Sequence, residues 1–274
     1  MATPMSDEFV DPLLVGLRED LVTRDLRRAL DATALETQIG KVDKSDFPHV
    51  AARFVAERLE QELQQISGEE ERIEFVNRLL ATMSSVSHGE HIEGPKPQQL
   101  LSTAKPPHKA PQSPSIPISE VALLTNAQGD PRLGPELKTE MLSADAVDVV
   151  MSFVRWSGIR LIAQELQELN RRGVRVRLLT TTYMGATEKR ALDYLVNECG
   201  AEVRISYDTQ TTRLHAKAWV FRRNTGFHTG YIGSSNLSKA AMVDGLEWNV
   251  RVSNIQTPAL VEKFEATFES YWQS

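Results

Sequence analysis

The sequence predicts an α/β protein in which a mixed sheet is flanked by helices and preceded by a small all-α region. The amino-terminal third has apolar residues at helical spacing. A stretch that holds seven of the chain's 13 prolines follows it. Beyond that stretch, short apolar segments alternate with amphipathic ones. The expected division is a helical region over residues 1–86, a proline-rich linker over residues 87–119 and an α/β domain over residues 120–274.

The composition limits the class of protein. Hydrophobic residues make up 41% of the chain and charged residues 25%, which is ordinary for a globular protein. No apolar run approaches the roughly 20 residues of a membrane-spanning helix, and the polar start lacks the regions of a signal peptide. Cys199 is the only cysteine, which excludes an intrachain disulfide and a cysteine-based zinc site. A cytoplasmic protein is therefore expected.

The net charge of −6 argues at first against a nucleic-acid partner. The distribution of charge changes that expectation. Residues 1–110 carry 13 basic and 19 acidic side chains, whereas residues 155–223 carry 13 basic and 7 acidic ones. The basic segment also holds His215 and Lys217, where a phosphodiester backbone would need positive charge. Ordinary solvated faces are the alternative explanation of the same charges.

Three helices are expected in the amino-terminal region, over residues 12–30, 47–66 and 69–84. Leucines recur at helical spacing in the first, and charges fill the opposite positions. Pro48 suits the first turn of the second helix. The third begins with carboxylates, which the helix dipole favours there. No chemistry is indicated in this region, so a helical bundle or a dimerisation arm is expected.

The linker is expected to be extended chain, because its density of prolines excludes a long helix and disfavours a packed sheet. His88, His91 and His108 lie in or beside it. None of the three has a cysteine or acidic partner at a metal-binding spacing, so no metal site is expected there.

The α/β domain is expected to begin with a helix over residues 134–143 and a buried, mostly apolar strand over 146–153. Residues 155–158 form a turn at the carboxyl end of this strand. A helix over 159–171 and a second strand over 174–180 follow.

Thr187 is expected to cap a helix over residues 188–199, which Gly200 closes, and a strand over 201–207 follows. This alternation of strands and helices implies parallel pairing with right-handed crossovers. The remaining elements are a strand over 213–223, its hairpin partner over 227–232, a strand over 246–252 and an amphipathic helix over 258–271.

The strand over residues 213–223 carries the most informative pair of residues. His215 and Lys217 are two positions apart, so period-two alternation places both side chains on one face, which Trp219 and Phe221 continue. A neutral imidazole beside an ammonium is suited to attack on a phosphate. The imidazole would act as nucleophile or acid, and the lysine as a fixed positive charge for the anion.

His215-x-Lys217, Gly233-Ser-Ser-Asn236 and Glu247 together resemble the phospholipase D superfamily. The fuller pattern of that superfamily is His-x-Lys-x4-Asp-x6-Gly-x2-Asn. Here Arg222 stands where the aspartate would be, and the gap to Gly233 is a few residues longer. This departure disfavours the lipase branch and favours the nuclease branch, in which an asparagine and a glutamate complete the site.

A wider resemblance covers residues 120–274. The stretches Leu123–Ala127, Phe153–Arg160 and Gly245–Asn249 are similar to the phospholipase-D-like nuclease domain that opens bacterial superfamily-2 helicases of restriction type. The resemblance implies a phospholipase-D-like fold, a role in restriction or defence against foreign DNA, and a helicase partner in the same polypeptide or in trans. This sequence itself has no Gly-x4-Gly-Lys-Ser/Thr loop.

The resemblance assigns roles to the site residues. His215 would attack phosphorus and form a phosphohistidine, and Lys217 would hold non-bridging oxygens as a point charge. Alone, a strand histidine is commonly a structural group, and an edge-strand lysine can serve to discourage aggregation. Glu247 would orient an imidazole through its other ring nitrogen, and its alternative is a surface carboxylate.

The Ser-Ser-Asn segment is expected to contact the phosphate. Asn236 would donate an amide hydrogen bond to the phosphate oxygens, and it can also form a turn or a helix cap. Ser234 or Ser235 would add hydroxyl or backbone donors in an anion-binding nest.

The chain has a single His-x-Lys, whereas the chemistry requires one histidine to attack and one to protonate the leaving oxygen. A homodimer in which two copies of His215 meet across a twofold axis would supply both. No metal or other cofactor is expected, because histidine and lysine replace Lewis-acid activation.

Arg155 and Trp156, at the carboxyl end of a strand, could clasp or stack on nucleic acid, although a buried tryptophan is the commoner explanation. Arg160, one helical turn away, is a further candidate for a phosphate contact.

These observations predict a metal-independent phosphodiesterase that acts on DNA as an endonuclease. Two alternatives stay open. One is a catalytically idle DNA-binding or dimerisation module. The other is a phospholipase or phosphatidyl transferase, against which stand the missing aspartate, the single His-x-Lys and the lack of an amphipathic membrane face.

Overall fold

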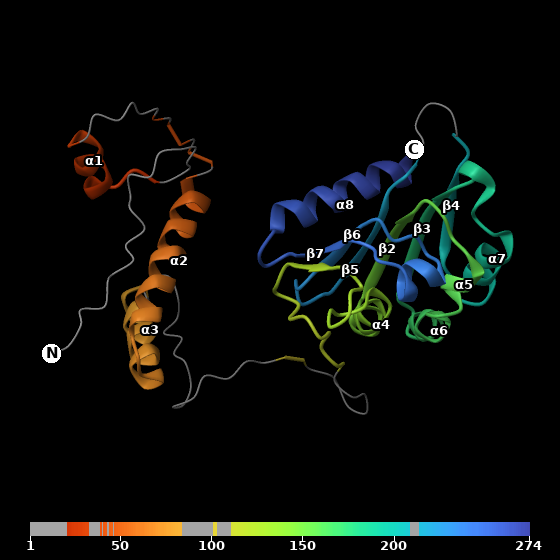
Figure 1. The fold of residues 1–274 in the computed structure, drawn as a ribbon, viewed down its shortest axis with the longest axis horizontal. Coiled ribbons are helices and arrows are strands. Elements are labelled where there is room, and N and C mark those ends of the chain that lie inside the picture. Colours follow the sequence, from red (N-terminus) through yellow and green to blue (C-terminus); the bar gives the residue numbers. More distant parts are fainter. Residues whose placement is uncertain are drawn as a thin grey trace. The chain divides into compact units, whose positions relative to one another are not determined.

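The structure is a computed structural model that describes residues 21–32, 39, 41–42, 44–45, 47–83, 101–102, 111–208 and 214–274. The chain divides into two compact units, residues 1–99 and residues 100–274. Figure 1 shows the helices of the first unit and the sheet of the second. The two units are considered separately below.

Among its described residues, the first unit contains three helices, of which the first begins later than expected, since residues 21–23 are not helical. They are α1 (Arg24–Asp31), α2 (Phe47–Gln65) and α3 (Glu69–Met83). Thr23 caps α1, because its hydroxyl accepts a hydrogen bond from the backbone N–H of Leu26 at 3.1 Å. Residues 12–20 of the first expected helix lie outside the described residues, as do residues 87–100 and 103–110 of the expected linker.

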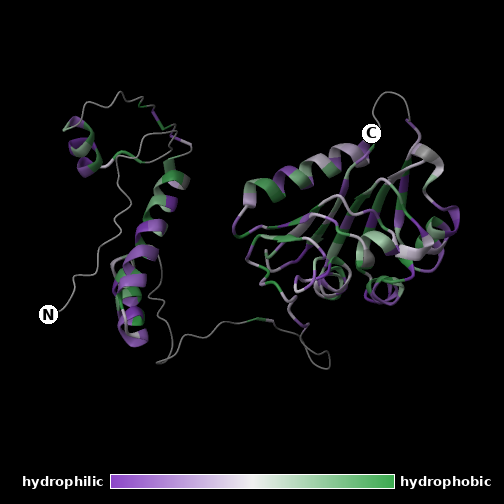
Figure 2. Cartoon of the chain, viewed as in Figure 1, coloured by the Kyte–Doolittle hydropathy of each residue, from purple (hydrophilic) through white to green (hydrophobic). Residues whose placement is uncertain are grey.

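Helices α2 and α3 are both rich in charge. Figure 2 shows hydrophilic and hydrophobic residues mixed along them. The Arg72 guanidinium donates to the carbonyls of Leu63 and Ile66, at 2.9 and 2.8 Å, and so closes the turn between the two helices. No residue of α1 or α3 is buried. The helices of this unit therefore bury little apolar surface by themselves.

The second unit is built on one mixed sheet of seven strands in the order β1-β7-β6-β5-β2-β3-β4. The strands are β1 (Ala122–Leu124), β2 (Ala146–Met151), β3 (Arg175–Thr181), β4 (Glu202–Ser206), β5 (Lys217–Arg222), β6 (Thr229–Gly233) and β7 (Asn249–Ser253). Strands β2, β3 and β4 pair in parallel, whereas β5, β6, β7 and β1 add to the sheet antiparallel. The expected mixed sheet is confirmed.

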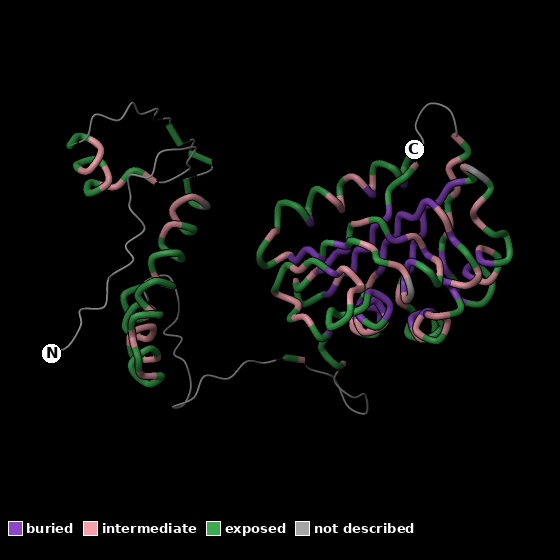
Figure 3. Tube along the Cα trace, viewed as in Figure 1, coloured by how far each residue is buried: buried purple, intermediate pink, exposed green. Residues whose placement is uncertain are grey.

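Helices cover both faces of the sheet (Figure 1). They are α4 (Leu133–Ser143), α5 (Trp156–Ile159), α6 (Ala163–Arg171), α7 (Lys189–Asn197) and α8 (Pro258–Gln273), with a short 3-10 turn, η1 (Tyr183–Gly185), and a π-helical turn, η2 (Ala240–Asp244). One face packs Val149 and Trp219 against α4, α6 and α7. The other packs Val150 against Phe268 and Trp272 of α8. Figure 3 shows the buried residues concentrated in the strands between these layers.

In the second unit, the structure corrects three details of the expected elements. The expected helix over residues 159–171 is broken, and α5 and α6 replace it with a turn between them. Gly158 lies in α5 just before this break, and a Cβ there would lie 2.4 Å from the carbonyl oxygen of Leu237, so α5 packs directly against the loop after β6. Thr187 does not cap α7. Its hydroxyl donates instead to the Thr181 carbonyl at 3.0 Å, and Glu188 occupies the cap position.

The third correction concerns the strand with the His-x-Lys pair. Residues 209–213 lie outside the described residues, and β5 begins only at Lys217. His215 therefore precedes the strand. It still lies opposite Phe153, beyond the last paired residue of β2, because Lys217 pairs with Met151.

A buried ion-pair network lies on one face of the sheet. On the α4 side, the fully buried Glu140 carboxylate accepts from Arg223, from Arg251 at 3.0 Å, from Thr229 at 2.7 Å and from Tyr231 at 3.0 Å. With so many donors, the charge of Glu140 is compensated inside the fold.

The segment just before β1 forms hydrogen bonds with the sheet, one of them to an arginine of the same network. Arg251 donates to the carbonyl of Pro117 at 2.6 Å, and the Ser253 hydroxyl donates to that of Ile118 at 2.9 Å. The last residues of the expected linker therefore pack on the sheet.

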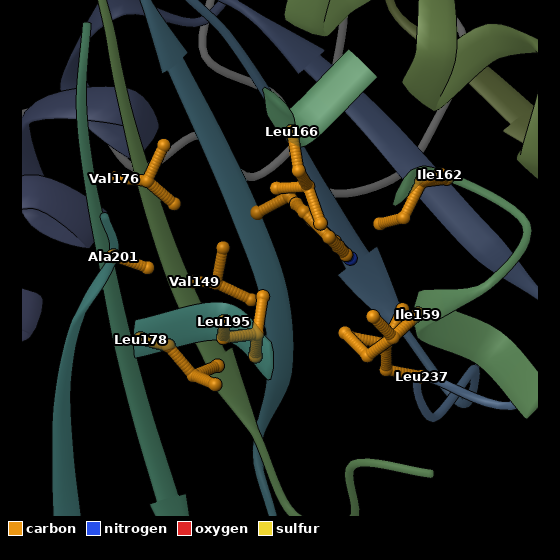
Figure 4. Close-up of a pocket in the computed structure, with 10 residues that line it drawn as sticks. Val149, Ile159, Ile162, Leu166, Val176, Leu178, Leu195, Ala201 and Leu237 are labelled. Atoms are coloured by element: carbon orange, nitrogen blue, oxygen red, sulfur yellow. The ribbon is translucent and has the colours of Figure 1, made fainter. Parts of the chain in front are cut away.

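A cavity of about 10 Å³ lies between the sheet and its helices (Figure 4). Apolar side chains line it, among them Val149 and Leu178 of the sheet, Leu166 of α6 and Leu195 of α7. It is about the size of one water molecule but offers no polar partner to hold one. The cavity is a packing gap in the core and has no features of a binding site.

Candidate active site

The candidate site lies at one edge of the sheet, where the ends of four strands meet. β5 begins at Lys217, which pairs with Met151 at the end of β2. β6 ends at Gly233, which pairs with Asn249 at the start of β7. The residues just outside these ends therefore gather at the same edge. They are His215, Ser234, Ser235, Asn236 and Glu247.

Several contacts fix the side chain of Lys217. Its ammonium donates to the carbonyl oxygen of His215 at 3.0 Å and lies 3.4 Å from both imidazole nitrogens of that residue. The Ser152 hydroxyl, at the end of β2, is 3.5 Å away. Only 8% of Lys217 is exposed, and burial lowers the pKa of its ammonium, although the Glu247 carboxylate partly offsets this by raising it.

His215 is exposed. The Phe153 ring meets its imidazole edge-on, with centroids 6.5 Å apart and an interplanar angle of 81°. The imidazole is therefore oriented by Phe153 and Lys217 while it stays accessible to a ligand. An accessible imidazole next to a held ammonium suits nucleophilic attack on an anion.

Asn236 is fixed by its side-chain oxygen, which accepts a hydrogen bond from the backbone N–H of Phe153 at 3.2 Å. The next residue, Leu237, forms an isolated parallel bridge with Val154. These contacts attach the loop after β6 to the end of β2. They leave the side-chain amide nitrogen of Asn236 without an acceptor among the described residues, so it can donate to a ligand.

The two serines have different partners. The Ser234 hydroxyl donates to the Glu247 carboxylate and accepts from the Trp248 N–H at 3.1 Å. Ser235 is buried, and its hydroxyl accepts from the Asn249 side chain at 2.8 Å. The Ser235 hydroxyl therefore contributes to the internal packing of the domain. Ser234 links the loop after β6 to the loop before β7 at the site.

Glu247 lies close enough to Lys217 to affect its pKa, but no hydrogen bond joins it to His215 within the described part of the chain. Within one chain its carboxylate is held by Ser234. The structure thus brings Glu247 to the site while its expected contact with an imidazole is not made inside a single copy.

Trp156 has protein partners on more than one side. The Arg190 guanidinium lies 4.3 Å from the centre of its ring, and the Tyr194 ring meets it edge-on at 5.1 Å. Its backbone N–H donates to Glu188 at 3.0 Å. These contacts agree with the commoner explanation, a tryptophan that packs against the rest of the protein. Arg155, by contrast, is exposed at the carboxyl end of β2.

Arg160 is also exposed, one turn further at the end of α5. Arg155 and Arg160 are thus the two expected phosphate contacts whose side chains lie on the surface.

Arg222, which stands in the place of the superfamily's aspartate, lies away from the candidate site. It lies at the far end of β5, about 17 Å along the strand from Lys217. Its guanidinium pairs with Asp148 at 2.5 Å and with Glu265 of α8 at 2.8 Å. Arg177 binds the same Asp148 at 2.7 Å. The arginine is part of the packing of α8 against the sheet.

Two site residues are absent from the sequence-based set. Ser152 contacts Lys217, and its hydroxyl donates to the Ala216 carbonyl at 3.1 Å. Phe153 supports both His215 and Asn236. Their only signal in the sequence is their place at the carboxyl end of an apolar strand.

Among the described residues, no group of three or more histidine, cysteine, aspartate or glutamate side chains gathers as metal ligands would. In the same part of the chain, no helix has the length and apolar character needed to cross a membrane.

One family model matches part of the chain. Residues 139–272 match the family model described as "Cardiolipin synthase, PLD-like domain", where PLD stands for phospholipase D. No curated protein matches the chain.

The chain is also similar to several solved structures. NucT from Helicobacter pylori is 17% identical, with a TM-score of 0.43 over 57% of this chain and 96% of that one. Nuc from Salmonella typhimurium, a phospholipase D family member, is 21% identical, with a TM-score of 0.41 over 56% and 94%. Phosphatidylserine synthase from Haemophilus influenzae is 16% identical, with a TM-score of 0.39 over 53% and 38%.

The matched family segment runs from α4 to α8 and contains all of the candidate site. Residues 139–272 of this chain thus match the model of a phospholipase-D-like domain.

Proposed function

We propose that this domain is a metal-independent phosphodiesterase that cleaves DNA through a phosphohistidine intermediate on His215. The observation that carries the proposal is the Lys217 ammonium held 3.4 Å from both nitrogens of an accessible imidazole. Such an arrangement places a nucleophile and a fixed positive charge where one phosphate can meet both.

The proposed reaction has two displacements at phosphorus. An imidazole nitrogen of His215 attacks, the bond from phosphorus to the leaving oxygen breaks, and that oxygen takes a proton from a second imidazole. Water then attacks the phosphohistidine, the P–N bond breaks, and the second imidazole accepts the proton of the water. Lys217 and the free amide N–H of Asn236 would hold the non-bridging oxygens in both steps.

The second imidazole would come from another copy of the chain in a homodimer. An exposed apolar row beside the site supports this proposal. It consists of Leu123, Ile232, Trp248 and Val250, between 37% and 67% exposed. Strand pairing places Leu123, Ile232 and Val250 on the same face of the sheet, and Trp248 lies just before β7, two residues from Val250. A second copy that covers this row would bring its own His215 near the first, and Glu247 could then orient an imidazole across the interface.

DNA is the proposed substrate because Arg155 and Arg160 extend positive charge outward from the site. A role in restriction or in defence against foreign DNA, a cytoplasmic location and a helicase partner belong to the same proposal. They are supported by the resemblance of the sequence to the nuclease domains of restriction-type helicases.

The proposal is tested by incubating labelled duplex and single-stranded DNA with the protein in excess EDTA. The wild type is compared with His215→Ala and with Lys263→Met, a control on the exposed surface of α8. Cleavage by the wild type and the control, lost in His215→Ala, is the expected result. Cleavage that EDTA abolishes would contradict the mechanism.

Two further outcomes point to the competing functions. DNA binding without cleavage in the wild type and in His215→Ala alike would indicate an idle binding module. Turnover of phosphatidylglycerol vesicles that depends on His215, without DNA cleavage, would indicate a phosphatidyl-transfer enzyme.

A further inference from the structure

Asn126 is the only residue other than glycine in the described chain with a positive φ, 55°. A residue with a Cβ adopts this left-handed conformation at a cost, and it persists where the surroundings hold it in place. Asn126 lies between the end of β1 and the start of α4, outside the set of site residues described above. Its side chain shows what holds it.

The Asn126 amide joins three backbone groups. Its nitrogen donates to the carbonyls of Ala241 and Gly245, both at 3.1 Å, and its oxygen accepts from the backbone N–H of Leu133 at 3.0 Å. One side chain therefore connects the first turn of α4 to the π-helical turn η2 and to the residue that follows it. Both donors and an acceptor of the amide are used.

The η2 turn is packed tightly at this point. The backbone N–H of Gly245 donates to the Ala240 carbonyl at 2.6 Å, and a Cβ on Gly245 would lie 2.9 Å from that same oxygen. A Cβ on Gly134 of α4 would lie 3.2 Å from the Met242 carbonyl. The turn therefore has little freedom to shift as long as Asn126 holds its end.

The loop leaves this turn and reaches the site within two residues. Leu246 and Trp248 are 80% and 67% exposed, whereas Glu247 between them turns inward to the Ser234 hydroxyl. The direction of Glu247 thus depends on the path of the backbone from Gly245 onward.

We propose that Asn126 is a positioning residue of the candidate site, because it fixes the Gly245 carbonyl and so sets the loop that delivers Glu247 to Ser234 and Lys217. Only the catalytic consequence rests on the proposed function. The placement of Glu247 can be tested without substrate.

The test follows the titration of the Lys217 ammonium by NMR, with the signal assigned through Lys217→Arg. Asn126→Gly suits the test because glycine adopts the positive φ freely, so only the side-chain contacts are lost. Glu247 raises the pKa of Lys217. We therefore expect Asn126→Gly to shift this titration to lower pH, as Glu247→Gln does, and to add no further shift in the Glu247→Gln background.

Two variants complete the design. Gly245→Ala pushes on the Ala240 carbonyl inside the same turn and is expected to shift Lys217 in the same direction. Asn224→Gly, at an exposed turn, is the matched control, since its backbone N–H keeps its bond to Asp145. The control is expected to leave the titration of Lys217 unchanged.

An unchanged Lys217 titration in folded Asn126→Gly, or an equal additional shift in the Glu247→Gln background, would overturn the inference. If the wild type cleaves DNA, Asn126→Gly is also expected to lose about 10- to 100-fold in rate, the cost of a misplaced catalytic group. A wild type that cleaves nothing counts against the proposed function alone, because the titration still decides the role of Asn126.

Discussion

At the residue scale, the candidate site depends on two opposing effects on the pKa of Lys217, which burial lowers and the Glu247 carboxylate raises. Its ammonium is nearly enclosed, yet it has a carbonyl, a hydroxyl and a nearby carboxylate around it. Sequence spacing alone predicted that Lys217 and His215 would be neighbours, because alternation along a strand is a property of the backbone. The supports from Ser152 and Asn126 could not be predicted, since they depend on contacts between distant segments.

The pH dependence of cleavage follows from this balance. Lys217 must be charged to hold a phosphate, and burial lowers its pKa below the ordinary lysine value of 10.5. Activity is therefore expected to fall on the alkaline side at a pH below 10.5, as the ammonium loses its proton. Glu247→Gln removes the carboxylate that raises this pKa, so the alkaline limb should move to lower pH. The pH profile of kcat/KM, measured for both proteins, checks the direction, and a shift to higher pH would contradict it.

At the scale of elements, apolar periodicity was sufficient to predict α2, α3, α7, α8 and the buried strands β2 and β3. Their patterns are long or strongly apolar, so the local signal agrees with the tertiary environment. The break between α5 and α6 was not predicted, and neither was the contact of Gly158 with the loop after β6, which is not local. The short strand β1 and the π-helical turn η2 carry little periodic signal for the same reason.

Gly158→Ala tests the importance of that contact. The added Cβ would lie 2.4 to 2.6 Å from backbone atoms of Leu237 and Ser238, so the loop that carries Asn236 must move. We expect a loss of about 1–3 kcal/mol in the free energy of unfolding, typical of overpacking, together with a loss of cleavage. Urea denaturation measures the first. Gln164→Ala on the exposed surface of α6 is the control, and equal stability of the two variants would refute the importance of the contact.

At the scale of the whole molecule, the single His-x-Lys and the exposed apolar row on the sheet lead to the same proposal of a homodimer. The sequence supplied the first argument, because a histidine count is visible in it. The second required the pairing of β1, β7 and β6, which places Leu123, Val250 and Ile232 side by side.

Trp248→Ser is expected to weaken the dimer, because it removes the aromatic and most exposed side chain of the row, and to reduce cleavage in parallel. Sedimentation velocity over a range of concentrations measures the first effect. Tyr207→Ser, an exposed aromatic beside the opposite edge strand β4, is the matched control. A wild type that stays monomeric while it cleaves DNA would contradict the proposed source of the second imidazole.

The most direct test of the central claim is to trap the intermediate. The protein is mixed with DNA labelled at the scissile phosphate in excess EDTA, quenched in alkali, digested and analysed by mass spectrometry. The proposed mechanism predicts a nucleotide adduct on His215 that survives alkali, is lost in acid and is absent in His215→Ala. Cleavage with no adduct, or an adduct on another residue, would contradict nucleophilic attack by His215.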